Sequence, residues 1–232
     1  PCVFGSYAQV LRTPGSARFT ASGFMARMPM AITGLSIVLA VSDTTGSYGL
    51  AGGVAAGYAL ATAGGGIMSS RLVDRHGQRR ILNLFALAHA ACLLAFVAAV
   101  WLAAVPAMFA FAILAGACQP SIGPAVRARW SYTLRNSPPT SLRTAFALEG
   151  IWDEVIFTAG PLIATALALQ VWLESPLLLS AGLVTVGTVL LCAQRSTEPP
   201  ITEPHREGPR PTSAIRSTGM PVATMLGLGL GS

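Results

Sequence analysis

Long apolar segments alternate with short polar gaps along most of the chain. A helix needs about 20 apolar residues to cross a bilayer, and six segments reach or approach that length. The predicted spans cover residues 19–41, 48–68, 81–105, 106–126, 144–171 and 176–193. The pattern therefore predicts an all-α fold, a polytopic membrane bundle of six transmembrane helices.

The segments outside the spans divide the chain further. Residues 1–18 are expected to form an N-terminal segment and residues 19–194 the six-helix bundle. Residues 195–218 are rich in Pro, Glu and Arg and are expected to form a linker. A last apolar run within residues 219–232 is too short to cross a bilayer, so we expect it to be the truncated start of a seventh helix.

Composition excludes several classes of protein. Apolar residues make up 53% of the chain and charged residues only 10%, against about 25% charged in a typical soluble domain. The chain has too few charges to cover a soluble globule and too many apolar residues to be disordered. The four cysteines have neither C-x-x-C nor Cys/His spacing, so we predict no metal site and no disulfide framework. No hydrolase, protease or metal-carboxylate motif lies in the spans, which predicts no enzyme activity and no cofactor.

Positive charge is distributed unevenly along the chain. The formal net charge is +6, and all 15 basic residues are arginines. All of them except Arg27 precede the first span or follow the second, fourth and sixth, and the remaining gaps contain none. Arginines in short loops mark the cytoplasmic side of a membrane, so we expect a cytoplasmic N-terminus in a multi-pass protein of the plasma membrane. This distribution indicates topology and contact with membrane lipid rather than binding of nucleic acid.

The gap after the second span contains the ordered motif S-R-L-V-D-R-H-G-Q-R-R over residues 70–80. A glycine there allows a tight turn, and the arginines suit an anionic membrane surface. The order resembles the signature G-x-L-a-D-R-x-G-R-K, which transporters of the major facilitator superfamily carry between their second and third helices. The matching residues are Leu72, Asp74, Arg75, Gly77 and Arg79. Ser70 stands in place of the first Gly, and Gln78 in place of the first basic residue.

This resemblance covers roughly residues 10–232, as the N-terminal six-helix half of a 12-helix fold and the start of its seventh helix. It implies secondary active transport of a small-molecule substrate by alternating access, with the substrate between two halves. It also implies a partner, either a missing C-terminal half or a second chain. The resemblance also implies that the loop residues Asp74, Arg75, Gly77 and Arg79 form a cytoplasmic contact with the other half that opens and closes during transport. We call this group the gating latch, and we expect Arg127 or Arg129 beside it.

Charged residues fall inside two predicted spans: Arg27 in the first, and Glu149, Asp153 and Glu154 in the fifth. A charge near the bilayer centre costs several kcal/mol unless it is paired or hydrated. Both spans run in the same direction, so these groups lie at comparable depths, and we expect Arg27 to pair with Asp153 or Glu154. Two interpretations stay open. The pair is either a fixed link between two helices or a site for substrate binding or proton coupling.

Gly160 and Pro161 follow these acids on the fifth span. They resemble part of the antiporter motif G-x-x-x-G-P-x-x-G-G, although Ile156, Ala164 and Thr165 depart from it. The partial match favours proton-coupled efflux by antiport. Against this, the fourth span lacks the arginine that many proton-coupled members of the family place before a glycine. The alternative function is a non-transporting membrane remnant or a structural partner subunit.

Two further features concern the fourth span and the span ends. Gln119 and Pro120 are expected to interrupt the fourth helix and to expose its backbone to a cavity. Trp101, Trp130 and Trp172 lie near predicted span ends, where we expect them to act as interfacial anchors.

Overall fold

The computed structural model describes residues 3–200 of the chain, with side chains from residue 6 onward. The predicted start of a seventh helix, and the predicted linker beyond residue 200, lie outside the described residues. Within residues 3–200 the fold is all-α, without strands. It contains 6 helices or helix pairs that are long and apolar enough to cross a membrane, which confirms the predicted polytopic bundle.

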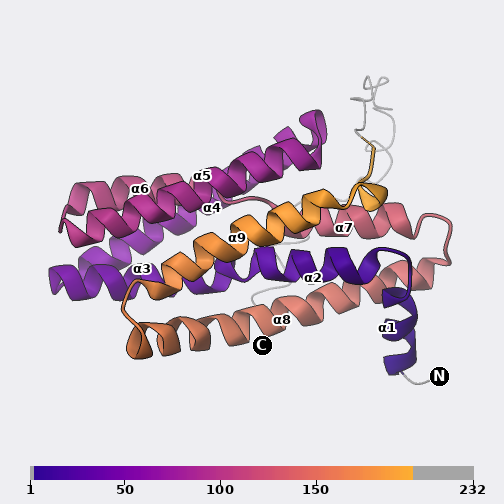
Figure 1. The fold of residues 1–232 in the computed structure, drawn as a ribbon, viewed down its shortest axis with the longest axis horizontal. Coiled ribbons are helices and arrows are strands. Elements are labelled where there is room, and N and C mark those ends of the chain that lie inside the picture. Colours follow the sequence, from indigo (N-terminus) through magenta and orange to yellow (C-terminus); the bar gives the residue numbers. More distant parts are fainter. Residues whose placement is uncertain (1–2, 201–232) are drawn as a thin grey trace, which may run out of the picture. The chain divides into compact units, whose positions relative to one another are not determined.

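The first and fourth spans are each divided into two helices (Figure 1). The first consists of α2 (Ser16–Arg27) and α3 (Pro29–Thr45), and the fourth consists of α6 (Val105–Ala117) and α7 (Ile122–Thr133). The undivided spans are α4 (Tyr48–His76), α5 (Gln78–Trp101), α8 (Pro139–Gln170) and α9 (Ser175–Ala193). A short helix, α1 (Val3–Leu11), precedes the first span, and the 3-10 turn η1 (Arg195–Thr197) follows the sixth.

The breaks in these two spans have different local causes. Pro29 is the first residue of α3, and proline lacks the N–H that a continuous helix would use. The break in the fourth span is longer, because residues 118–121 are not helical and include Gln119 and Pro120. The sequence predicted this second interruption, whereas the division of the first span was not expected.

Several helices extend beyond the predicted spans. α4 continues past Met68 to His76, and α7 continues past Val126 to Thr133. Hydropathy marks only the apolar part of a helix, and arginine is a good helix former beyond it. α4 ends at His76, and the next residue, Gly77, has φ of 86° and ψ of 152°, which are accessible almost only to glycine. α5 begins directly after it, at Gln78.

The described helices pack together around shared apolar clusters. α4 packs against α6, α5 packs against α6 and α9, and α2 packs against α7 and α9. Figure 1 shows α9 running alongside α2 and α5, with α8 along α3. Gly160 of α8 lies so close to α3 that a Cβ at this position would overlap Ala31. This contact brings together the two spans that carry the intramembrane charges.

Large apolar side chains are exposed on the outer surfaces of several spans. Examples are Leu84, Leu87 and Leu94 on α5, Leu162 and Leu169 on α8, and Val186 and Leu190 on α9. A soluble monomer rarely exposes so much apolar surface. Lipid tails would cover it, so the surface agrees with a membrane location.

Candidate functional site

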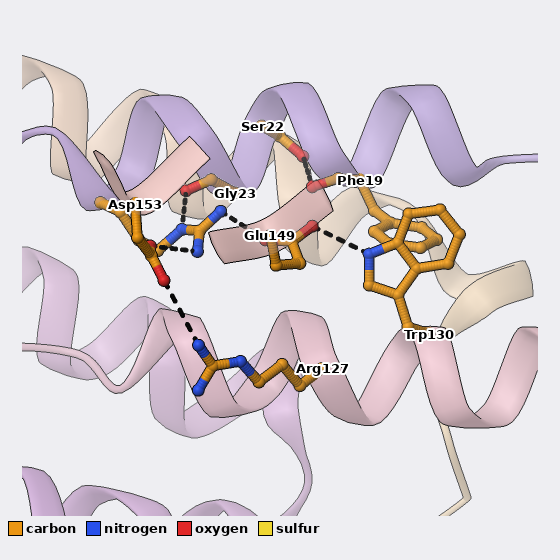
Figure 2. A network of polar contacts seen from close by, with 8 residues as sticks. Phe19, Ser22, Gly23, Arg127, Trp130, Glu149 and Asp153 are labelled. Carbon is orange, nitrogen blue, oxygen red and sulfur yellow. Dashed lines mark hydrogen bonds and ion pairs between the residues drawn. The ribbon is translucent and has the colours of Figure 1, made fainter. Parts of the chain in front are cut away.

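Arg27, the last residue of α2, holds two carboxylates of α8. Figure 2 shows these carboxylates, Glu149 and Asp153, together with Arg127 and Trp130 of α7. Its Nη1 lies 2.7 Å from Asp153 Oδ1, and its Nη2 lies 2.5 Å from Glu149 Oε2. Its Nε donates to the carbonyl of Gly23 at 3.3 Å. The structure therefore joins the first and fifth spans through Arg27 and Asp153, as the sequence predicted.

The second partner of Arg27 differs from the expected alternative. Glu154 was named beside Asp153, but its side chain is exposed and forms no ion pair with any described residue. Glu149 takes this place because it lies one helical turn before Asp153 and shares its face. Glu154 is rotated by about 100° from Asp153 around the helix axis.

Glu149 is fully buried, and both of its oxygens have donors. Its Oε1 accepts a hydrogen bond of 2.8 Å from Trp130 Nε1. The Trp130 ring is also fully buried and meets Phe19 edge-on, with ring centroids 4.7 Å apart. The prediction that Trp130 is an interfacial anchor is therefore wrong. α7 continues past the predicted end of the fourth span, so it carries this indole into the bundle, where its N–H needs an acceptor.

Asp153 has a second cationic partner in Arg127. Arg127 Nη2 lies 3.3 Å from Asp153 Oδ2, and the two side chains are 51% and 31% exposed. Arg127 was expected in a loop beside the gating latch, because the apolar run of the fourth span ends at Val126. The structure instead places Arg127 on α7, where it faces the carboxylate that Arg27 also holds.

The two pairs differ in how easily they can separate. Arg27 is buried, and an unpaired buried charge is strongly destabilising. Arg27 keeps Glu149 as a counter-ion even if Asp153 becomes protonated or changes partner. Arg127 is half exposed, so water can solvate it when it leaves Asp153. The geometry thus makes Asp153 the carboxylate that can exchange partners and Glu149 the one that cannot.

A cavity of about 300 Å³ opens beside this cluster. Arg27, Arg127 and Asp153 lie in its wall, together with apolar side chains and the break in the fourth span. The apolar and polar residues include Met30, Ile156, Phe157, Thr62, Gln119 and Pro120. Gln119 and Pro120 therefore line a cavity, as predicted from the sequence.

A neighbouring cavity of about 470 Å³ shares three lining residues with the first: Met30, Thr62 and Gln119. Tyr58 also lines it and donates a hydrogen bond of 2.5 Å from its hydroxyl to Gln119 Oε1. The two cavities adjoin along α3, α4, the α6–α7 break and α8, and the lining is charged on one side and largely apolar elsewhere. We refer to them together as the Asp153 cleft.

Gly160 and Pro161 lie where α8 passes close to α3, behind this cleft. Gly160 is buried against Ala31, so any side chain there would push α8 away from α3. Pro161 lies inside α8 and cannot donate a helical hydrogen bond to the carbonyl of Phe157, a residue that lines the cleft. The motif thus acts on the same two spans that the Arg27 cluster joins.

The predicted latch residues lie around the α4–α5 turn. Asp74 and Arg75 are exposed at the end of α4, Gly77 forms the turn, and Arg79 is exposed in the first turn of α5. No described residue forms an ion pair with Asp74, Arg75 or Arg79. The backbone N–H of Arg79 donates to Glu198 Oε1 at 3.1 Å.

Arg129 was expected beside the latch but is fully buried on α7. Its Nε donates to Gln78 Oε1 at 2.9 Å, and its Nη1 donates to Gln194 O at 2.9 Å and to Thr197 Oγ1 at 3.0 Å. Arg129 therefore ties α7 to the start of α5 and to η1. This link was not predicted, because a basic residue beyond an apolar run usually lies in an exposed loop.

The family model of the Major Facilitator Superfamily matches residues 19–232. No curated protein and no solved structure matches the chain. Among the described residues, no group of His, Cys, Asp and Glu could hold a metal ion. The matched segment covers nearly the whole chain, which therefore belongs to the Major Facilitator Superfamily, a family of membrane transporters.

Proposed function

We propose that this chain is a secondary active transporter that works by alternating access, with the Asp153 cleft as its substrate site. The single observation that carries the proposal is the sharing of Asp153 between a buried and a half-exposed arginine. A carboxylate with one replaceable partner can bind and release a cation without leaving a buried charge unpaired.

The substrate class follows from the lining of the cleft. Aromatic and aliphatic side chains surround one exchangeable carboxylate, so an amphiphilic organic cation fits best. Its positive charge would take the place of Arg127 at Asp153 Oδ2, and its apolar body would lie against Met30, Ile156 and Phe157.

The same carboxylate gives a mechanism for antiport. Asp153 can hold a proton or the cation but not both, so each leaves when the other binds. For a monovalent cation, one proton moves inward as one cation moves outward, and the exchange is electroneutral. The partial antiporter motif at Gly160 and Pro161 supports this direction, so we propose an efflux antiporter of the plasma membrane.

Alternating access also needs a second wall. Substrate sites in this fold lie between two six-helix bundles, so we propose that this bundle works against a second one, in the same polypeptide or in another chain. The N-terminus would lie in the cytoplasm. The exposed residues around the α4–α5 turn would then contact the second bundle on that side in one state and separate from it in the other. These residues are Asp74, Arg75 and Arg79.

Transport into everted membrane vesicles tests the proposal. Vesicles that contain the chain together with its second bundle are acidified inside, and the accumulation of ethidium, a lipophilic fluorescent cation, is followed. We expect uptake that collapses with the pH gradient and is lost in Asp153→Asn. Glu154→Gln is the matched control, because Glu154 is exposed one residue away and has no ion pair in the described part of the chain.

Two outcomes contradict the proposal in different ways. Unchanged uptake by Asp153→Asn removes this carboxylate from the mechanism. No uptake by the unaltered chain in the presence of its second bundle favours the alternative, a non-transporting structural subunit. The fully buried Arg27–Glu149 pair is the observation that supports this alternative, because it joins two helices without contributing an exchangeable group.

A further inference from the structure

A basic pocket of about 630 Å³ lies between the α4–α5 turn and η1. Its lining includes Arg79, Arg80 and Arg195, together with His76, Asn83 and Glu198. We propose that this pocket binds the phosphate of an anionic phospholipid and that the acyl chains of this lipid lie along α5 and α9. The proposal does not depend on the substrate or on the direction of transport.

The charges in the pocket favour an anion. Three arginines face one carboxylate, that of Glu198, which already accepts a hydrogen bond from the backbone N–H of Arg79. Arg80 and Arg195 are exposed, and neither forms an ion pair with a residue that the structure describes. Guanidinium groups bind phosphate through paired hydrogen bonds, so these two side chains are suited to hold it from two sides.

The position of the pocket along the spans favours a lipid as the source of the phosphate. α5 begins at Gln78 and α9 ends at Ala193, so the pocket lies where two neighbouring spans reach the same membrane surface. Phospholipid headgroups occupy this level, and basic pockets between helix ends bind anionic ones.

An apolar stripe continues from the pocket along α5. Leu84, Leu87 and Leu94 follow Arg80 at helical spacing, and 59%, 56% and 52% of their surfaces are exposed. On the adjacent α9, Val186 and Leu190 are exposed within two turns of Ala193, the last residue of the helix before Arg195. A free phosphate ion would use only the arginines, whereas a phospholipid would use both the arginines and the stripe.

The experiment measures lipid binding to the purified full chain in detergent micelles. Fluorescent phosphatidylglycerol is the probe, and its anisotropy reports binding. Unlabelled phosphatidylglycerol, phosphatidylcholine and inorganic phosphate are the competitors. We expect competition by phosphatidylglycerol only, because the choline cation faces the arginines and phosphate lacks acyl chains. Equal competition by phosphatidylcholine overturns the charge argument, and equal competition by inorganic phosphate overturns the lipid as the source.

Variants locate the site. Arg80→Gln combined with Arg195→Gln is expected to weaken binding roughly 30-fold, at about fivefold for each arginine near the membrane surface. Arg71→Gln is the matched control, because Arg71 is exposed on α4 and does not line the pocket. Unchanged affinity in the double variant, or an equal loss in the control, contradicts the proposal. The double Arg→Lys variant keeps both positive charges but loses the paired hydrogen bonds, so it should bind more weakly than the unaltered chain and more tightly than the double Arg→Gln variant. An affinity as low as that of the double Arg→Gln variant would contradict a charge-based site.

Discussion

Replacing Arg27 by glutamine tests whether the charged cluster also holds the bundle together. The change leaves Glu149 fully buried with only its hydrogen bond from Trp130. Removing one partner of a buried ion pair costs about 3–5 kcal/mol, because the remaining charge stays in a medium of low polarity. We therefore expect the free energy of unfolding to fall by about 3 kcal/mol, at the lower end because the Trp130 hydrogen bond remains. Chemical unfolding of the purified chain in micelles measures it.

Two further variants make the measurement decisive. Arg27→Gln combined with Glu149→Gln removes both buried charges, and we expect it to recover most of the lost free energy, since two amides can hydrogen-bond to each other. Arg127→Gln breaks only a half-exposed pair and should cost about 0–1 kcal/mol. The reasoning is refuted if Arg27→Gln costs no more than Arg127→Gln, or if the double variant is less stable than Arg27→Gln alone.

The remaining predictions concern backbone positions and one indole. Gly160→Ala should destabilise the chain, because its Cβ would overlap Ala31. Gly150→Ala on the same helix meets open space and should stabilise the chain by up to about 1 kcal/mol. Thermal melting in micelles compares the two variants. Gly77→Ala should cost about 1–3 kcal/mol because of its positive φ, and an unchanged melting temperature would contradict the turn geometry. Trp130→Phe should cost about 1–3 kcal/mol, since one oxygen of Glu149 loses its donor; no loss in the melting experiment would show that this hydrogen bond is not needed.

The spans could be predicted because lipid imposes a simple requirement, a run of apolar residues about as long as the bilayer is thick. Their ends could not be predicted in the same way. Hydropathy falls at Met68 and Val126, but the helices continue to His76 and Thr133. Nothing in the apolar pattern distinguishes an arginine on a continuing helix from an arginine in a loop.

The charged cluster was partly predictable for a physical reason. A charge such as Arg27 inside a span needs a counter-ion at the same depth, which pointed to the acids of the fifth span. The choice of Glu149 rather than Glu154 depends on how α8 is rotated toward α2, which the sequence alone does not give. The roles of Arg127 and Trp130 were not predicted, because both lie on the part of α7 beyond the predicted span.

The break in the fourth span divides its contacts between two groups of helices. α6 packs against α4 and α5, whereas α7 packs against α2 and α8. The non-helical residues between them, which include Gln119 and Pro120, interrupt the backbone hydrogen bonds that would otherwise make the fourth span one rigid rod. The 3.3 Å contact between Arg127 and Asp153 therefore depends on the packing of α7 and not on the neighbours of α6.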